Sequence, residues 1–181
     1  MQGSRLAASD WSQAECIIAR VLAPTRLLFV CYGNIVRSPL AEALFRRLVA
    51  SSGAEERYAV DSAGTSGAHD GQPPHPTTQR VAEAHGLHLK ARSRRVQVED
   101  FDRFDWMLAL DGDVASDLEA LARSSRHQDK IRLLRRFDPL ASDQASIPDP
   151  IRAGSDAFEM TYEIIERSVR GLFTALEAGQ I

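Results

Sequence analysis

Short apolar runs alternate along the chain with longer segments that have the hydrophobic spacing of helices. The runs contain few polar side chains, which is the pattern of strands buried on both faces. The predicted strands are Leu27–Val30, Tyr58–Val60, Trp106–Leu110 and Ile131–Leu134. Helices are predicted at Thr77–His85 and Val114–Ala122, and a long helix closes the chain. In that last helix the apolar residues recur every three or four positions, namely Phe158, Tyr162, Ile165, Val169, Leu172 and Leu176.

This alternation predicts βαβ units. The expected fold is α/β, three-layered and doubly wound, with a mainly parallel four-stranded sheet and helices on both faces. Ligands of such sheets bind at the carboxyl ends of the strands. The segment 31–38 follows the first strand and ends at Pro39, where a helix is expected to begin with Ser38 as its cap.

Residues 1–26 are predicted to form an extension with one short helix that starts at Ser9 or Asp10 and ends before Pro24. Its apolar stripe consists of Trp11, Ala14, Ile18 and Leu22. We expect this stripe to pack on the protein's own domain, and a homodimer contact is the alternative. The rest of the chain, residues 27–181, is interpreted as one domain.

The composition narrows the class of protein. With 181 residues, 44% hydrophobic and 26% charged, the chain suits one globular domain. A formal charge of -3 gives no reason to expect a nucleic acid or a membrane surface as the partner. The two cysteines, Cys16 and Cys31, do not suffice for a disulfide framework, and no Cys/His spacing resembles a zinc site. We therefore predict a cytoplasmic protein without a metal or another cofactor.

The segment from Cys31 to Ser38 carries the clearest chemistry. A loop wrapped above a helix N-terminus aims backbone N–H groups inward and attracts a dianion such as phosphate. The planar fork of Arg37 can bind two phosphate oxygens and stabilise the charge of a transition state. The same donors favour a thiolate at Cys31, positioned to attack phosphorus. The phosphate-binding loop is predicted to comprise Tyr32, Gly33, Asn34, Ile35, Val36 and Ser38.

Taken singly, these residues have simpler explanations. Cys31 on its own is most easily explained as a structural thiol, and Arg37 as a surface cation. Their combination with glycine and a Ser-Pro pair in one strand-to-helix turn favours catalysis. A nucleoside-triphosphate loop is excluded, because its lysine is missing here.

The segment from Val30 to Glu42 resembles the low-molecular-weight protein tyrosine phosphatase family. Further matching motifs are Asp61–Thr65, His85-Gly86, Phe104-Asp105, Leu110-Asp111 and Pro148–Pro150, so that the resemblance covers residues 27–176. It implies hydrolysis of phosphate monoesters through a cysteinyl-phosphate intermediate, with Cys31 as the nucleophile. The substrate would be a phosphotyrosine protein or, alternatively, a small phosphomonoester. Phosphate-like oxyanions would inhibit the enzyme.

The resemblance also implies roles for residues outside the loop. Asp149, stiffened by two flanking prolines, would be the general acid, although composition alone favours a plain turn. Asn34, Ser38, Ser62 and His85 would form a hydrogen-bond network that supports the loop. Without the resemblance, Ser62 is a serine at a strand end and His85 a histidine at a helix end.

The chain departs from the family pattern at three places. Val36 replaces a second cysteine that many members carry beside the arginine. Ala68 and the pair Ile151-Arg152 replace aromatic side chains that wall the pocket in phosphotyrosine-specific members, so the preference for an aromatic substrate is open. Tyr32 is a candidate for a compensating wall. Arg152 suggests acidic substrates, although an exposed arginine is usually only solvated.

Two other functions use a similar loop. An arsenate reductase would need relay cysteines after Cys31, and none exists, which leaves only reduction by an external thiol such as glutathione or mycothiol. A non-catalytic phosphate-binding module needs the loop alone, and it would not require Cys31, Arg37 and Asp149 together.

Overall fold

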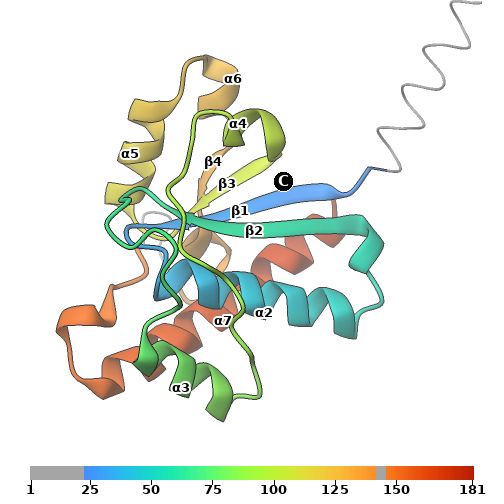
Figure 1. Cartoon of the computed structure of the whole chain (residues 1–181). Helices are drawn as coiled ribbons and strands as arrows, with labels where there is room; N and C mark the ends of the chain where they lie inside the picture. Colours follow the sequence, from blue (N-terminus) through green and yellow to red (C-terminus); the bar gives the residue numbers. More distant parts are fainter. Residues whose placement is uncertain (1–22, 142–145) are drawn as a thin grey trace, which may run out of the picture.

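Four parallel strands form the centre of the structure, a computed structural model that describes residues 23–141 and 146–181 (Figure 1). The strands are β1 Thr25–Cys31, β2 Tyr58–Gly64, β3 Trp106–Ala109 and β4 Ile131–Leu133, and their order in the sheet is β2-β1-β3-β4. All four predicted strands are confirmed, and all pairings are parallel. The expected α/β class is therefore correct.

The strands are buried on both faces of the sheet, because alternate side chains pack into two separate hydrophobic clusters. In β1, Leu27 and Phe29 belong to one hydrophobic cluster, whereas Leu28 and Val30 belong to the other. All four are fully buried. Side chains alternate between the two faces of a strand, so a continuous apolar run requires a layer of helices on each side.

Two layers of helices cover the sheet (Figure 1). On one face lie α2 Arg37–Ser51 and α7 Ser155–Glu177, with α3 Pro76–Ala84 beside α7. On the other lie α4 Asp100–Arg103 and α5 Gly112–Leu121, and α6 Ser125–Gln128 follows them. Single helical turns occur at η1 Glu55–Arg57, η2 Leu134–Phe137 and η3 Pro150–Arg152.

One predicted helix boundary is wrong. The helix α2 begins at Arg37 rather than Pro39, and its N-cap residue is Val36, whose side chain makes no capping hydrogen bond. Ser38 lies inside the first turn and uses its hydroxyl elsewhere, as described below. The missing N–H of Pro39 is tolerated because the first turn of a helix has no intrahelical acceptors for its N–H groups.

Residues 1–22 lie outside the described residues, and with them the predicted N-terminal helix and Cys16. The division into an extension and a domain at residue 27 thus stays a prediction. Within residues 23–141 and 146–181, every helix is too short or too polar to cross a bilayer.

Candidate active site

The loop between β1 and α2 turns its carbonyl groups outward. Cys31 O and Tyr32 O accept hydrogen bonds of 2.9 Å from the backbone N–H groups of residues 65 and 66. Gly33 O accepts from Ser93 Oγ at 3.0 Å, and Ile35 O accepts from the N–H of residue 75 at 2.7 Å. The N–H of each peptide group points opposite to its carbonyl. The N–H groups of this loop are therefore directed inward, which makes an anion nest above the helix N-terminus.

The Cys31 sulfur lies at the floor of this nest. Its side chain is buried at the end of β1. Sγ accepts a hydrogen bond from Asn34 N at 3.2 Å and lies 3.0 Å from Ser38 Oγ. The Ser38 hydroxyl is also 3.1 Å from Ala63 O, and its single proton serves one of these two acceptors at a time. The sulfur therefore has a backbone N–H and a hydroxyl within hydrogen-bond distance at the floor of the nest.

Asn34 connects the loop to its surroundings. Its φ of 51° is the only positive value at a non-glycine residue in the described parts of the chain, and asparagine tolerates that conformation better than most residues. Its Nδ2 donates to Ser38 Oγ at 2.9 Å and to Ser62 Oγ at 3.1 Å. Its Oδ1 accepts from Arg94 N at 2.9 Å. The side chain is 1% exposed, so these bonds hold the loop from within the protein.

Two neighbouring segments, the end of β2 at Gly64 and residues 93–96, pack against the outer side of the loop. Gly64 ends β2, and a Cβ atom there would lie 2.6 Å from Tyr32 O and 3.0 Å from Asn34 N. Gly64 is also bonded to the segment 94–96 through Gly64 N to Arg94 O at 2.9 Å and through Val96 N to Gly64 O at 2.8 Å. The backbones approach so closely that only glycine fits.

Arg37 lies at the start of α2 and is 2% exposed. One terminal nitrogen donates to Asp111 Oδ2 and, at 3.0 Å, to Ile147 O. The other donates to Asp149 Oδ2 at 2.8 Å. Burial alone would lower the pKa of Arg37, but the nearby charges of Cys31, Asp149 and Asp111 raise it above the ordinary value. The buried Nε has no hydrogen-bond partner among the described residues, which makes it a donor for an anion in the nest.

The two carboxylates beside Arg37 differ in surroundings. Asp111 caps α5, because its Oδ1 accepts from Val114 N at 2.8 Å. Asp111 therefore begins a helix and also contacts the arginine. Asp149 stands before η3, where its Oδ1 accepts from Ile151 N at 3.2 Å. Its side chain is 36% exposed, against 19% for Asp111, so Asp149 is the carboxylate open to a substrate.

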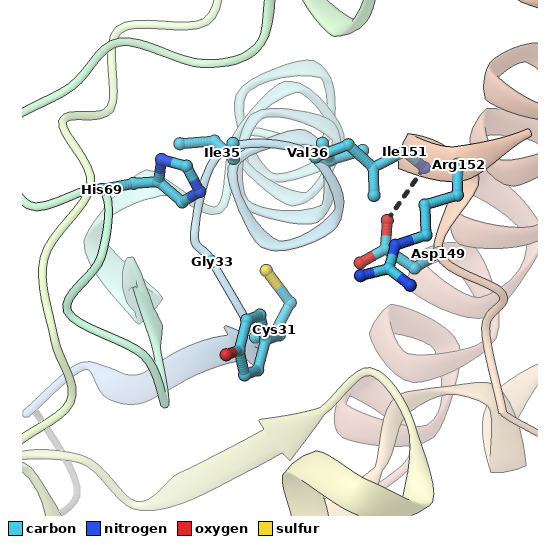
Figure 2. Close-up of a pocket in the computed structure, with 9 residues that line it drawn as sticks. Cys31, Gly33, Ile35, Val36, His69, Asp149, Ile151 and Arg152 are labelled. Carbon is cyan, nitrogen blue, oxygen red and sulfur yellow. Dashed lines mark hydrogen bonds between the residues drawn. The ribbon is translucent and has the colours of Figure 1, made fainter.

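A pocket of about 560 Å³ opens above the sulfur (Figure 2). It is lined by Cys31, Tyr32, Gly33, Ile35, Val36, His69, Asp149, Ile151 and Arg152. The expected wall residues Tyr32, Ile151 and Arg152 are among them. Ala68 is not, and the next residue, His69, takes the place expected for it. A Cβ at Gly33 would lie 3.1 Å from His69 Cδ2, so the imidazole rests on the loop.

The expected supporting network is only partly assembled. Ser62 joins Asn34 and donates to Glu42 Oε2 at 2.7 Å. His85 does not hydrogen-bond to these side chains within the described structure. Its Nε2 pairs with Glu159, and its ring stacks on Tyr162 with centroids 3.9 Å apart. The sequence placed His85 at a helix end, and that is where it lies, as the C-cap of α3.

Glu42 was missed as a member of this network. It had been noted only as the last residue of the matching motif. From α2, Glu42 accepts from Ser62 Oγ with one oxygen and from Arg46 Nε at 2.9 Å with the other. The described parts of the chain contain no group of three or more His, Cys, Asp or Glu side chains arranged to hold a metal ion.

Comparisons with known proteins agree with this geometry. The family model of the low molecular weight phosphotyrosine protein phosphatases matches residues 26–180. A low molecular weight protein-tyrosine-phosphatase of Streptomyces coelicolor is 41% identical over 83% of this chain and 93% of its own length. The corresponding human phosphatase is 40% identical over 80% of this chain and 90% of its own length.

A solved structure shares both the fold and part of the sequence. The protein tyrosine phosphatase of Entamoeba histolytica superposes with a TM-score of 0.82 at 32% identity, and the match covers 87% of this chain and 99% of that one. The chain belongs to the low molecular weight phosphotyrosine protein phosphatase family, a family of cysteine-dependent hydrolases whose general mechanism passes through a cysteinyl-phosphate.

Proposed function

We propose that this chain hydrolyses phosphotyrosine esters with Cys31 as the nucleophile, Arg37 as the phosphate clamp and Asp149 as the general acid and base. The observation that carries the proposal is the loop in which the carbonyl groups of Cys31, Tyr32, Gly33 and Ile35 are engaged from outside. This arrangement leaves N–H groups of the loop around a buried sulfur. A site of this kind binds a phosphoryl group directly above a nucleophile.

In the first step the Cys31 sulfur attacks phosphorus, and the bond from phosphorus to the ester oxygen breaks. The departing oxygen takes a proton from Asp149, which is protonated for this step and becomes a carboxylate. Arg37 and the loop N–H groups hold the equatorial oxygens of the transition state.

In the second step a water molecule attacks the phosphorus of the cysteinyl-phosphate, and the bond from phosphorus to sulfur breaks. The carboxylate of Asp149 accepts the proton of that water. Ser38 donates its hydroxyl proton as a hydrogen bond to the leaving sulfur, from the 3.0 Å at which it already lies. Inorganic phosphate and the thiolate are regenerated, so the protein is unchanged after one turnover.

The pocket supports an aromatic ester as the substrate. The sulfur belongs to a side chain that is 2% exposed, whereas Tyr32 at the mouth is 58% exposed and Ile151 is 44% exposed. A phosphoryl group must therefore pass these side chains to reach the floor. The long, flat phenyl group of phosphotyrosine allows this and can pack against Tyr32 and Ile151.

The direct test uses p-nitrophenyl phosphate in the presence of EDTA. We expect turnover that EDTA does not reduce, competitive inhibition by phosphate and vanadate, and no turnover by Cys31→Ser. Rapid acid quench should trap phosphorus on the wild-type protein and none on the variant. Turnover without such an intermediate would refute the role of Cys31.

A substrate panel separates the remaining candidates. Phosphotyrosine peptides should be better substrates than sugar or nucleotide phosphates. The reverse order would indicate a phosphatase for small metabolites. An assay of arsenate reduction with glutathione or mycothiol should give no activity.

We also propose that the enzyme works in the cytoplasm, because its mechanism needs Cys31 in the reduced state. Whether the predicted helix of residues 9–23 supports a homodimer is tested by sedimentation of the full chain against one that lacks residues 1–22.

A further inference from the structure

Two basic side chains stand at the mouth of the pocket among the described residues that line it. His69 lies on one side and Arg152 on the other, with Cys31 between them (Figure 2). Of the pocket's lining residues only Asp149 is acidic, and it is paired with Arg37. Arg152 therefore brings a positive charge to the mouth, although the whole chain carries a formal charge of -3.

Both Arg152 and His69 have nitrogen atoms that can contact a substrate at the mouth of the pocket. Arg152 is exposed and forms no hydrogen bond or ion pair with another described residue, so all its donors face solvent at the mouth. His69 is half-buried, and its Nδ1 lies 3.1 Å from Gln72 Oε1. That contact leaves Nε2 as the nitrogen that can meet a substrate group.

We infer that Arg152 and His69 form a polar rim, with Arg152 as its charged member, that selects phosphotyrosine flanked on both sides by acidic residues. This inference rests on the proposed function and names its substrate class. A phosphotyrosine that enters the pocket carries its peptide backbone across the mouth, and residues before and after it pass the two sides of the rim. A carboxylate on one side meets the charge of Arg152, and a carboxylate on the other side can accept a hydrogen bond from the His69 ring. A basic flanking residue on the Arg152 side meets like charge.

Arg152 is exposed and His69 is half-buried at the open mouth, so each contact has a moderate effect. Exposed ion pairs typically contribute 0.2–1 kcal/mol, which corresponds to a factor of about 1.4 to 5 in affinity, and a hydrogen bond contributes a similar amount. Together the two contacts give an expected preference of about three- to tenfold in kcat/KM for the acidic substrate. Salt at 0.5 M should remove most of this preference by screening.

The test compares two phosphotyrosine peptides that differ only in their flanks, with Glu at two positions on each side in one peptide and Gln at the same positions in the other. The measured quantity is the ratio of their kcat/KM values at low and high salt, for wild type, Arg152→Gln, His69→Gln and the double variant. Arg126→Gln on α6 and His88→Gln after α3 remove the same side-chain types from exposed positions outside the pocket. Binding of both peptides to Cys31→Ser is measured in parallel by fluorescence anisotropy.

The inference predicts that the ratio falls about two- to threefold in each single rim variant and approaches one in the double variant, and that both control variants keep the wild-type ratio. A wild-type ratio of one, or an equal loss in the control variants, overturns the inference while leaving the phosphatase activity standing. Tighter binding of the Glu peptide by Cys31→Ser, together with no turnover of either peptide by the wild type, would support the rim and refute the proposed function.

Discussion

Replacing Gly64 by alanine tests whether the loop geometry, rather than the catalytic side chains alone, produces activity. The new Cβ would lie 2.6 Å from Tyr32 O, 3.0 Å from Asn34 N and 3.1 Å from Gly33 C, all of them backbone atoms of the loop. Restoring ordinary contact of about 3.4 Å to Tyr32 O requires a displacement of about 0.8 Å. The loop cannot rotate a flexible side chain out of the way, so the nest itself has to move.

The two expected effects differ in size. Overpacking at a tight backbone contact costs about 1–3 kcal/mol of stability. A displacement of about 1 Å in a catalytic array lowers the rate about 100-fold. We therefore expect Gly64→Ala to remain folded under native conditions, to lose about two orders of magnitude in kcat and to bind vanadate more weakly.

The assay combines kcat and KM for p-nitrophenyl phosphate, vanadate inhibition and urea unfolding. Gly112→Ala is the matched control, because among the described residues its Cβ would meet only Ser146 Oγ, at 3.9 Å. A Gly64→Ala enzyme with kcat and vanadate affinity within twofold of wild type would refute the claim that this close approach sets the loop geometry.

Three further substitutions test individual roles. Asp149→Asn should lower kcat/KM by about 10²–10⁴-fold for phenyl phosphate, whose leaving group needs a proton, and much less for p-nitrophenyl phosphate, and equal losses would exclude a general acid. Asn34→Ala should be less stable because it keeps the positive φ and loses the hydrogen bonds of the amide. Asn34→Gly should have a free energy of unfolding about 1–2 kcal/mol higher than Asn34→Ala in urea, and identical unfolding midpoints of the two variants would rule out backbone strain. Arg37→Lys should keep the charge but lose the fork, so kcat should fall about 10²–10³-fold in steady-state assays, and full activity would show that a point charge suffices.

The strands were predictable because strands that are buried on both faces appear in the sequence as continuous apolar runs. Each is apolar throughout where both faces are covered, as in Leu27–Val30. The predicted ends of β1 and β2 were too early because the last residues are polar or small, such as Cys31 and Gly64, although they continue the ladder. The short helices α4 and α6 were missed because four residues are too few to show a helical period.

Motif matching located the loop, but it did not say where each side chain points. Ser38 was expected both to cap a helix and to support the loop beside the sulfur. Its hydroxyl does not cap α2, but it does lie within hydrogen-bond distance of Cys31 and Ala63. Ala68 was expected at the pocket wall, and the turn presents His69 there. Both outcomes depend on how the backbone turns by one residue, a feature for which side-chain type carries no signal.

The loop after β1 and the segment that holds it from behind lie far apart in the sequence. Gly33 is bonded to Ser93 and Asn34 to Arg94, and each pair is 60 positions apart. Closing those distances costs chain entropy, so the anion nest cannot exist in an isolated strand and helix or in a chain that has built only half of its sheet. Affinity for phosphate should therefore require the docking of residues 93–96 as well as the strand and helix that carry the loop. Because phosphate and vanadate bind only the completed nest, their presence shifts the folding equilibrium toward it, and a phosphate-containing buffer should raise the midpoint of thermal unfolding.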